Sequence, residues 1–284
     1  MAVDKELMDK DLLIMGVLNV TADSFSDGGM YFDPGQATER ALQMVEEGAD
    51  IVDIGGESSR PGSEPVSIEE ELARVVPVTA SLAQQTDALI SVDTVKPEVA
   101  KAALDAGASM VNDVSNLRDS DELARIAAQH DAHLILMHSR GTPRTMGALT
   151  AYSDVVAEVR ASLADAANRA AAAGMEHSRI WIDPGIGFAK TAAQSMTLLA
   201  RLDSLVSLGY PVLVGPSRKS FIGELDGSPV DRRLGGTAAA VTAAVMLGAR
   251  AIRVHDVPEM RQAALLARAV VAARGSASEK ERHV

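Results

Sequence analysis

Short apolar runs alternate with longer amphipathic stretches along the chain. The runs are rich in Val, Ile and Leu, and they cover residues 12–20, 50–56, 88–94, 110–114, 133–138, 180–185, 212–217 and 251–256. They are too short for typical helices and almost continuously apolar, as strands are when a sheet is buried on both faces. The pattern therefore predicts eight buried strands.

The stretches between these runs have the periodicity of helices. They cover residues 36–47, 68–85, 97–106, 120–130, 154–173, 193–208, 236–247 and 258–273. Several are followed by a glycine that precedes the next strand, namely Gly48, Gly107, Gly174, Gly209 and Gly248. A glycine just beyond the last helical residue is a common stop signal, because it adopts the left-handed conformation without a steric penalty.

Eight strand signals, each followed by a helical one, predict an α/β fold: a single (β/α)8 TIM barrel with parallel strands. A doubly wound open sheet is the alternative, but it does not require eight strands. The expected layout is an N-terminal extension over residues 1–11, a barrel domain over 12–274 and a polar C-terminal tail over 275–284.

Composition narrows the range of partners. The 284 residues include 27 Lys and Arg against 39 Asp and Glu, which gives a net charge of -12, and there is no cysteine. The acidic balance disfavours nucleic acid or an anionic membrane as the main partner. No apolar run approaches the roughly 20 residues of a membrane span, and the charged N-terminus does not resemble a signal peptide. We therefore expect a cytoplasmic protein with neither nucleic-acid nor membrane partners.

Polar residues end almost every predicted strand. They include Asn19, Asp53, Asp93, Asn112, His138, Asp183, Arg253 and His255. A single carboxylate at such a position, Asp93 or Asp183 for example, could simply cap the following helix. In a barrel, however, the carboxyl ends of all strands meet at one rim, where active sites lie. Burying this many polar groups together is unfavourable unless they bind something, so we predict a shared site.

The predicted rim has two chemical halves. Carboxylates and an amide, from Asp93, Asn112 and Asp183, suit a flat nitrogen heterocycle whose N–H groups need acceptors. The other half is basic and comes from the last two strands, the usual phosphate end of this fold. It comprises Lys219, Arg253 and His255. Asn19, at a strand end near a bound anion, would suit Mg2+, which keeps most of its waters and bridges phosphates.

Two loops that follow the first and second strands are expected to be mobile. One is rich in Ser, Asp and Gly but contains Phe25, and the other, at 55–65, contains Arg60. Such residues are ordinary loop formers. An aromatic ring and a cation on neighbouring loops could nevertheless close over a second, aromatic and anionic reactant and exclude water.

The chain resembles the dihydropteroate synthase family of pterin-binding TIM barrels. The resemblance rests on segments that occur in the family's order: "MGVLNVTADSFSDGG", "DIGGESSRPG", "SVDT", "VNDVS", "LMH", "DPGIGFAKT", "GPSRKSFIG" and "RVHD". It implies a (β/α)8 barrel and a transferase of folate biosynthesis that sulfonamides inhibit. Members condense 6-hydroxymethyl-7,8-dihydropterin diphosphate with p-aminobenzoate, in the presence of Mg2+, to give 7,8-dihydropteroate and diphosphate.

The resemblance also implies roles for individual residues. Catalytic roles are expected for Asp93, Asp183, Lys219 and Arg253. Binding of the pterin and its diphosphate is expected from these four together with Asn112, His255 and Ser59. The p-aminobenzoate site is expected to include Phe25, Ser59, Arg60, Pro61 and Ser220. Asn19 is the expected metal ligand, and family members are often homodimers.

Three positions depart from the common family pattern. Ala22 stands where a Pro is common, Ser59 where many members have Thr, and Ala189 where a Gly is frequent. None removes a chemical group. Two alternatives stay open at this point: a barrel that passes a methyl group from methyltetrahydrofolate to a corrinoid protein, and a non-catalytic pterin-binding paralogue. The "SSRPG" and "SRKS" segments favour the synthase, because the methyltransferase needs neither a diphosphate site nor an aminobenzoate loop.

Overall fold

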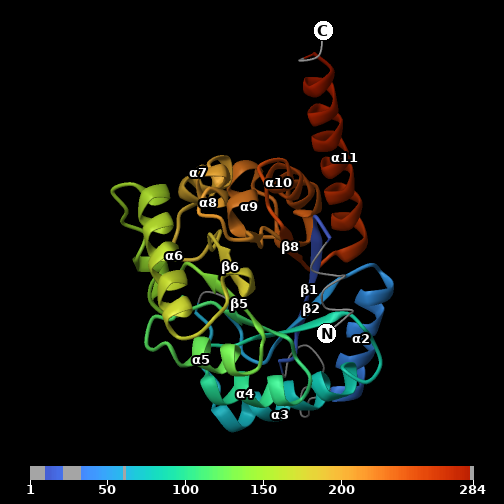
Figure 1. Ribbon diagram of the computed structural model, residues 1–284, viewed down its shortest axis with the longest axis vertical. Coiled ribbons are helices and arrows are strands. Elements are labelled where there is room, and N and C mark those ends of the chain that lie inside the picture. The colour runs from blue at the N-terminus through green and yellow to red at the C-terminus, as the bar shows by residue number, and fades with distance from the viewer. Residues whose placement is uncertain (1–9, 22–32, 60–61, 282–284) are drawn as a thin grey trace.

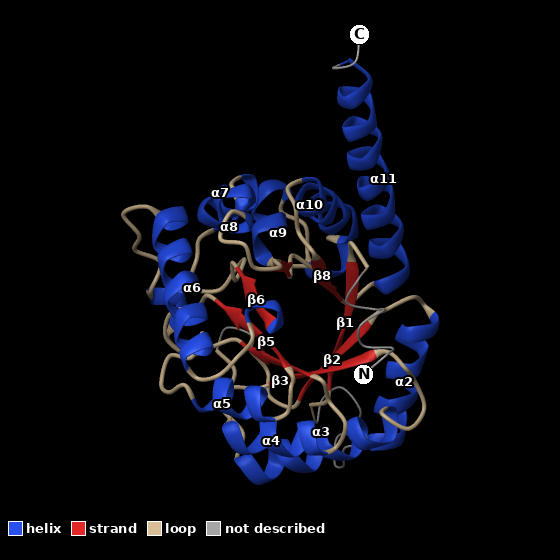
Figure 2. Cartoon of the chain, in the orientation of Figure 1, coloured by secondary structure: helices blue, strands red, loops and turns tan. Residues whose placement is uncertain are grey.

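Eight parallel strands form a barrel that is encircled by helices (Figures 1 and 2). The structure, a computed structural model, describes residues 10–21, 33–59 and 62–281. The strands are β1 (Leu13–Asn19), β2 (Ile51–Gly55), β3 (Leu89–Asp93), β4 (Met110–Asp113), β5 (His133–Met137), β6 (Ile180–Asp183), β7 (Leu213–Val214) and β8 (Ala251–Val254). Their order around the sheet is β6-β5-β4-β3-β2-β1-β8-β7. A parallel bridge between Ile182 and Val212 joins β6 to β7 and closes the ring. The predicted TIM barrel is confirmed.

Helices follow the strands around the outside of the barrel. They are α2 (Pro34–Glu46), α3 (Ile68–Leu82), α4 (Pro97–Asp105), α5 (Glu122–Gln129), α6 (Val155–Ala172), α7 (Ala192–Ala200), α8 (Leu202–Val206), α9 (Ser220–Asp226), α10 (Leu234–Met246) and α11 (Val257–Glu281). Three short 3-10 turns are η1 (Met146–Ala148), η2 (His177–Arg179) and η3 (Val230–Arg232). Side-chain caps fix the starts of several helices. At the start of α2, Asp33 accepts from the backbone N–H of Gly35 at 2.8 Å, and at the start of α7, Thr191 forms a capping box with Gln194.

Three helical features differ from the prediction. The expected helix at 193–208 is divided at Arg201 into α7 and α8. The short helix α9 was not expected, and it buries Phe221 and Ile222. The last helix was expected to end at 273 but continues to Glu281, so most of the predicted polar tail at 275–284 is helical. A lone Gly275 only weakens a helix, by about 1 kcal/mol, and does not stop α11, which projects beyond the barrel in Figure 1.

The barrel has two apolar layers because strand side chains alternate between two faces. Every second residue points inward, and a cluster from all eight strands fills one end of the barrel interior. We call this cluster the apolar plug; it consists of Leu13, Met15, Ile51, Leu89, Met110, Ile135, Trp181, Leu213 and Ala251. The intervening residues, such as Ile14 and Val52, point outward and pack beneath the helices.

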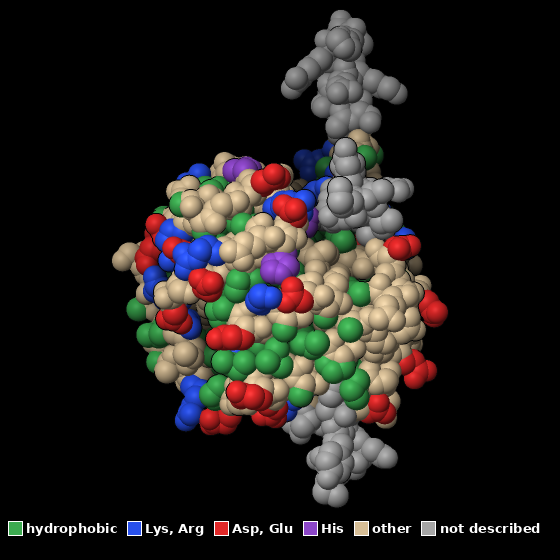
Figure 3. Space-filling model, turned by 60° about the horizontal axis from the view of Figure 1, so that its bottom comes forward, with side chains coloured by type: hydrophobic (Ala, Val, Ile, Leu, Met, Phe, Trp, Pro, Cys, Tyr) green, Lys and Arg blue, Asp and Glu red, His purple; other side chains and the backbone are tan. Residues whose placement is uncertain are grey.

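The surface reflects the composition. Acidic side chains lie around much of the outline of the face shown in Figure 3, as the net charge of -12 leads one to expect. Across the part of the chain that the structure describes, no helix combines the length and apolar character that crossing a membrane requires.

The plug should contribute strongly to stability. Ile135 is fully buried in it, so Ile135→Ala is expected to lower the free energy of unfolding by about 3 kcal/mol, through lost apolar burial and the cavity left behind. Leu225 is 68% exposed, and Leu225→Ala should change stability by less than about 0.5 kcal/mol. Urea unfolding of both variants checks this, and a similar loss in both would contradict the assignment of the plug as the core.

Candidate active site

A polar layer lies directly above the apolar plug. On five strands, the residue two positions beyond a plug residue is polar and points the same way into the barrel. These residues are Asp53, Ser91, Asn112, Asp183 and Arg253. Asp93 stands one further step along β3 and pairs in register with Asn112 of β4. Strand alternation thus brings these polar groups from β2, β3, β4, β6 and β8 to one mouth of the barrel.

Arg253 lies between two carboxylates of this layer. Its Nε is 2.7 Å from Oδ2 of Asp53, and its Nη2 is 2.7 Å from Oδ2 of Asp93. The Asp53 oxygen also accepts a hydrogen bond from Nδ2 of Asn112 at 3.0 Å. Burial opposes the charge of Arg253, but Asp53 and Asp93 outweigh it and raise the pKa of the guanidinium. The guanidinium therefore stays charged and is held across the barrel mouth.

Burial shifts the pKa values of two carboxyls in the same layer. It raises the pKa of Asp93 to about 7, although the nearby Arg253 acts in the opposite direction. Burial also raises the pKa of Asp183, against the lowering effects of Lys219 and of the Gly185 N–H, which lies 2.7 Å from Oδ1 of Asp183. Carboxyls poised in this way can accept hydrogen bonds from a bound heterocycle and respond to its charge.

Lys219 completes this half of the site from the segment after β7. Its Nζ donates to the backbone carbonyl of Ile186 and lies 4.4 Å from the centre of the Phe188 ring. Removal from water lowers the pKa of Lys219 to about 8, although Asp183 acts to raise it. Lys219 is thus a partly buried cation between a carboxylate and an aromatic face.

His255 lies next to the end of β7. Its Nδ1 is 2.9 Å from Oγ of Ser217, whose oxygen also accepts from the His255 backbone N–H at 3.3 Å. The neighbouring Arg218 forms an ion pair with Asp256, with Nε 2.8 Å from Oδ2. The imidazole and Lys219 therefore come from adjacent strand ends, as the phosphate end of the fold requires.

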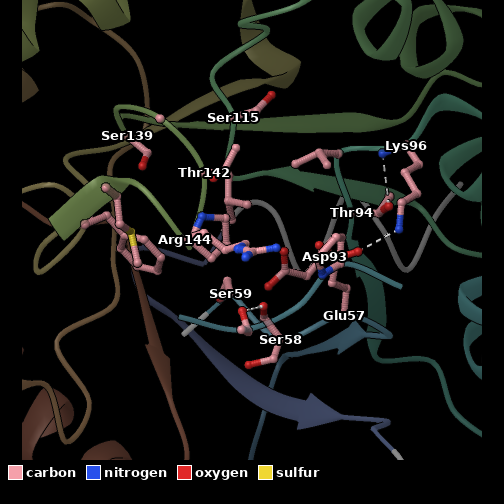
Figure 4. A pocket seen from close by; sticks show the side chains of 18 of the residues that line it. Glu57, Ser58, Ser59, Asp93, Thr94, Lys96, Ser115, Ser139, Thr142 and Arg144 are labelled. Carbon is pink, nitrogen blue, oxygen red and sulfur yellow. Dashed lines mark hydrogen bonds and ion pairs between the residues drawn. The ribbon is translucent and has the colours of Figure 1, made fainter. Parts of the chain in front are cut away.

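A cavity of about 400 Å³ opens beside the polar layer. Loops after β2, β3, β4 and β5 line it, and Asp93, Ser59 and Phe188 connect it to the residues described above. Figure 4 shows its lining side chains converging from these separate loops. Its wall carries both signs of charge: Lys96, Arg118 and Arg144 line it together with the carboxyl groups of Glu57, Glu71 and Asp93. The cavity therefore opens next to Asp93, and Arg118 and Arg144 are the lining cations that neither Glu57 nor Glu71 pairs with.

Lys96 fixes the base of the loop that follows β2. Its Nζ lies 2.7 Å from Oε2 of Glu57 and 2.9 Å from the carbonyl of Val66, and it also bonds Glu71 (Figure 4). The same Glu57 oxygen accepts from the Val66 N–H at 3.1 Å. The two ends of the loop are thus tied together and to the start of α4.

The structure places most of the predicted site residues at this mouth. Asp93, Asn112, Asp183, Lys219 and Arg253 lie together, His255 lies on the same face of β8 as Arg253, and Ser59 lines the cavity. Asn19 is the last residue of β1 and points to the same side as Met15. Ser220 is exposed at the start of α9. Phe25, Arg60 and Pro61 lie outside the described residues.

The side chains available as ligands show which kind of metal ion would fit this site. Among the described residues, no group of three or more His, Asp or Glu side chains is arranged to enclose an ion. An amide oxygen such as that of Asn19 is a hard ligand, which suits Mg2+ if the remaining positions are filled by water and substrate phosphate. The residues therefore fit a metal that arrives with a phosphorylated substrate, rather than a closed protein cage.

The role of Asp53 was missed by sequence reasoning. The sequence marks it as a polar strand end but indicates no partner for it. The structure shows it fully buried between Arg253 and Asn112, with Oδ1 left without a hydrogen-bond partner. The sequence does carry one signal for this role: Asp53 stands two residues after Ile51 on the same strand, and this spacing places both side chains on the face that points into the barrel.

One departure from the family pattern has a structural consequence. Ala189, where a Gly is frequent, has a left-handed backbone with φ of 49°. This conformation is unfavourable for a residue with a Cβ. The Tyr152 hydroxyl donates to the Ala189 carbonyl at 3.1 Å and helps to hold it there.

Comparisons with known proteins point to one family. The family model described as "Pterin binding enzyme" matches residues 15–255. The chain is 50% identical over 254 residues to a dihydropteroate synthase of Synechocystis sp., with 89% of this chain and 88% of the relative covered. It is 43% identical over 261 residues to that of Escherichia coli, with 92% of each covered.

Solved structures agree with these relatives. A Yersinia pestis dihydropteroate synthase in a sulfonamide drug complex is 41% identical, with a TM-score of 0.86 over 92% of this chain and 95% of that one. A Xanthomonas albilineans dihydropteroate synthase in complex with 7,8-dihydropteroate is 43% identical, with a TM-score of 0.82 over 93% and 94%.

The raised pKa of Asp93 makes a prediction about stability. In the folded state this carboxyl keeps its proton up to about pH 7, whereas in the unfolded chain it loses it near the ordinary value of 3.8. The folded state therefore binds more protons in this window, and the free energy of unfolding falls as pH rises. Between about pH 4.5 and about pH 8, the free energy of unfolding should fall by about 3 kcal/mol more in the wild type than in Asp93→Asn. Denaturant unfolding at both pH values measures this, and equal falls would contradict it.

Proposed function

The chain belongs to the dihydropteroate synthases, a family of pterin-binding transferases, and we propose how its described residues carry out the reaction. The enzyme condenses 6-hydroxymethyl-7,8-dihydropterin diphosphate with p-aminobenzoate, giving 7,8-dihydropteroate and diphosphate in folate biosynthesis. The observation that carries the residue assignment is the buried polar layer, in which acceptors from β3, β4 and β6 lie beside cations from β8 and the β7–α9 segment.

The acceptor half of the layer receives the pterin. The ring presents N–H groups along one edge, and Asp93, Asn112 and Asp183 provide buried acceptors and one amide donor. Lys219 closes this half beside Phe188. Burial strengthens each of these hydrogen bonds, since little water competes for the same atoms.

The basic half receives the diphosphate. Nε and Nη2 of Arg253 are held by Asp53 and Asp93, so its Nη1 is the group that can donate to phosphate oxygens. His255 lies two residues further along and points the same way. Asn19 would hold Mg2+, and the bound ion would supply charge neutralisation for the diphosphate. These groups favour departure of the diphosphate because they stabilise the charge that grows on it.

The reaction forms one bond and breaks another. The bond between the pterin methylene carbon and the diphosphate oxygen breaks, and its electron pair leaves with the diphosphate. The lone pair of the arylamine nitrogen forms the new C–N bond, and that nitrogen then loses a proton to solvent. We propose an SN1-like path, because the dihydropterin ring can delocalise positive charge and the carboxylates of Asp93 and Asp183 can stabilise it.

The p-aminobenzoate site is proposed at the rim, with Ser59 and Ser220 as its described members. Phe25, Arg60 and Pro61 are proposed to complete it from the two loops. A Xanthomonas albilineans relative, 45% identical, was solved with 4-aminobenzoic acid, which supports a site for the same compound here. Sulfonamides would compete for it. No observation on this chain favours the methyltransferase or the non-catalytic alternative.

We also propose a cytoplasmic homodimer. Helices α10 and α11 pack against each other, and α11 exposes Leu265, Leu266 and Val270, at 47%, 67% and 42%. Neighbouring exposed apolar side chains on one helix are typical of a protein interface. Light scattering should therefore give twice the mass of the chain, and Leu266→Arg should shift it towards a monomer. A wild-type monomer at micromolar concentration would contradict the proposal.

The main test is a diphosphate-release assay on the purified protein. Release should require the dihydropterin diphosphate, p-aminobenzoate and Mg2+ together, and 7,8-dihydropteroate should form in equal amount. Diphosphate released without incorporation of p-aminobenzoate would contradict the assigned reaction.

A variant at Asp93 tests the catalytic role that is proposed for the polar layer. Above about pH 7, where the Asp93 carboxyl is ionised, Asp93→Asn removes a negative charge near the pterin. At about pH 8, kcat should therefore fall by about a hundredfold or more, while KM for p-aminobenzoate changes little. Asp119→Asn is the control, because this side chain is 84% exposed on the β4–α5 loop. Wild-type turnover in Asp93→Asn would contradict its role.

A further inference from the structure

Lys190 is a buried lysine that the mechanism above does not use. It lies in the turn between β6 and α7, and it is 8% exposed. Its Nζ lies 2.9 Å from the carbonyl of Phe188, 3.0 Å from that of Gly185 and 2.9 Å from Nδ1 of His138. The His138 carbonyl lies at 3.3 Å. An ammonium group that faces only acceptors of this kind acts as a structural clamp.

His138 is the polar end of β5 for which no role has been assigned so far. It is 2% exposed, and its backbone N–H donates to the carbonyl of Asp183 at 2.9 Å. Burial and the positive charges of Lys190 and Arg140 lower the pKa of His138 to about 3. The ring is therefore neutral at physiological pH, and its Nδ1 is free to accept from the ammonium group.

The clamped turn has an irregular backbone that needs such support. Gly185, Gly187 and Ala189 all have positive φ values, of 64°, 80° and 49°. A Cβ on Gly185 would lie 2.0 Å from the carbonyl oxygen of His138, so the turn packs directly on the end of β5. Lys190 joins the turn to the end of β5, because its Nζ contacts backbone carbonyls of both.

The opposite side of the same turn forms the pterin half of the site. The Gly185 N–H donates to Asp183, the carbonyl of Ile186 accepts from Lys219, and the Phe188 ring faces the Lys219 ammonium group. A Cβ on Gly187 would lie 3.1 Å from Cδ of Lys219, which shows how closely the two segments pack. Any displacement of the turn is thus transmitted to Asp183 and Lys219.

We propose that Lys190, with Nδ1 of His138 among its acceptors, is a positioning residue that fixes the pterin-binding side chains Asp183, Lys219 and Phe188. This inference rests on the proposed function and extends it. The four acceptors around Nζ exceed what one ammonium group can satisfy ideally, so loss of any N–H weakens the clamp.

The clamp should depend on pH. Burial lowers the pKa of Lys190 to about 7; Asp183 on β6 acts to raise it, and Lys219 and Arg140 act to lower it. As pH rises through this value, Nζ loses one N–H and the positive charge, and the turn loosens. His138 on β5 is already neutral there and does not contribute. KM for the dihydropterin diphosphate should therefore rise on the alkaline side.

Two pairs of variants test the proposal. Lys190→Met should raise KM for the dihydropterin diphosphate by about tenfold or more and lower kcat, while KM for p-aminobenzoate stays within about twofold. It should also remove the part of the alkaline rise that lies near pH 7, whereas the part near pH 8, which follows Lys219, should remain. Lys101→Met, on the exposed face of α4, is the control. His138→Leu should reproduce Lys190→Met, whereas His138→Asn, which offers an amide oxygen near the place of Nδ1, should have a clearly smaller effect.

Hydrogen exchange separates this proposal from the proposed function. In Lys190→Met, the amides of residues 185–188 should exchange faster than in the wild type, whereas the exchange rates of amides in the barrel strands should not change. Synthase activity of the wild type tests the function alone. Unchanged exchange in the turn, or an equal rise in both KM values, would overturn the positioning role.

Discussion

The hydrogen bonds that Arg253 donates to Asp53 and Asp93 are the interaction on which the active site depends. A charge in the mouth of a barrel is unfavourable unless it is compensated, and breaking one member of such a cluster leaves another charge buried and unpaired. Because Arg253 comes from β8 and the carboxylates come from β2 and β3, the cluster spans β1 between them. It therefore fixes the relative positions of the groups proposed to meet the pterin and the diphosphate.

The apolar plug explains how the fold tolerates this polar layer. A layer of side chains such as Ile135 and Trp181 closes one end of the barrel, and the next inward positions remain available for chemistry. Because every second side chain of a strand points inward, one inward position can stabilise the fold and the next can take part in the chemistry. It also accounts for the depth of the site: the carboxyls lie just above apolar side chains, and burial raises the pKa values of Asp93 and Asp183.

Sequence reasoning predicted the barrel and the polar strand ends because both follow from local patterns. Alternating βα signals specify a barrel, and parallel strands bring their carboxyl ends to one side. It did not predict the partner of Asp53 or the clamp of Lys190, since these depend on which strands face each other across the interior. Nor did it predict α9 or the length of α11, because a short segment and a single Gly275 carry little local information. The roles of Phe25, Arg60 and Pro61 stay predictions.

The most direct test of the central claim is a calorimetric measurement of proton release when the dihydropterin alcohol binds. Asp93 is a buried carboxyl with a raised pKa, and it is proposed to accept N–H donors from the pterin. At about pH 6, in two buffers of different ionisation enthalpy, binding should release more protons from the wild type than from Asp93→Asn, because hydrogen bonding to the carboxylate favours its ionised form. Equal proton release from the two proteins would contradict the account.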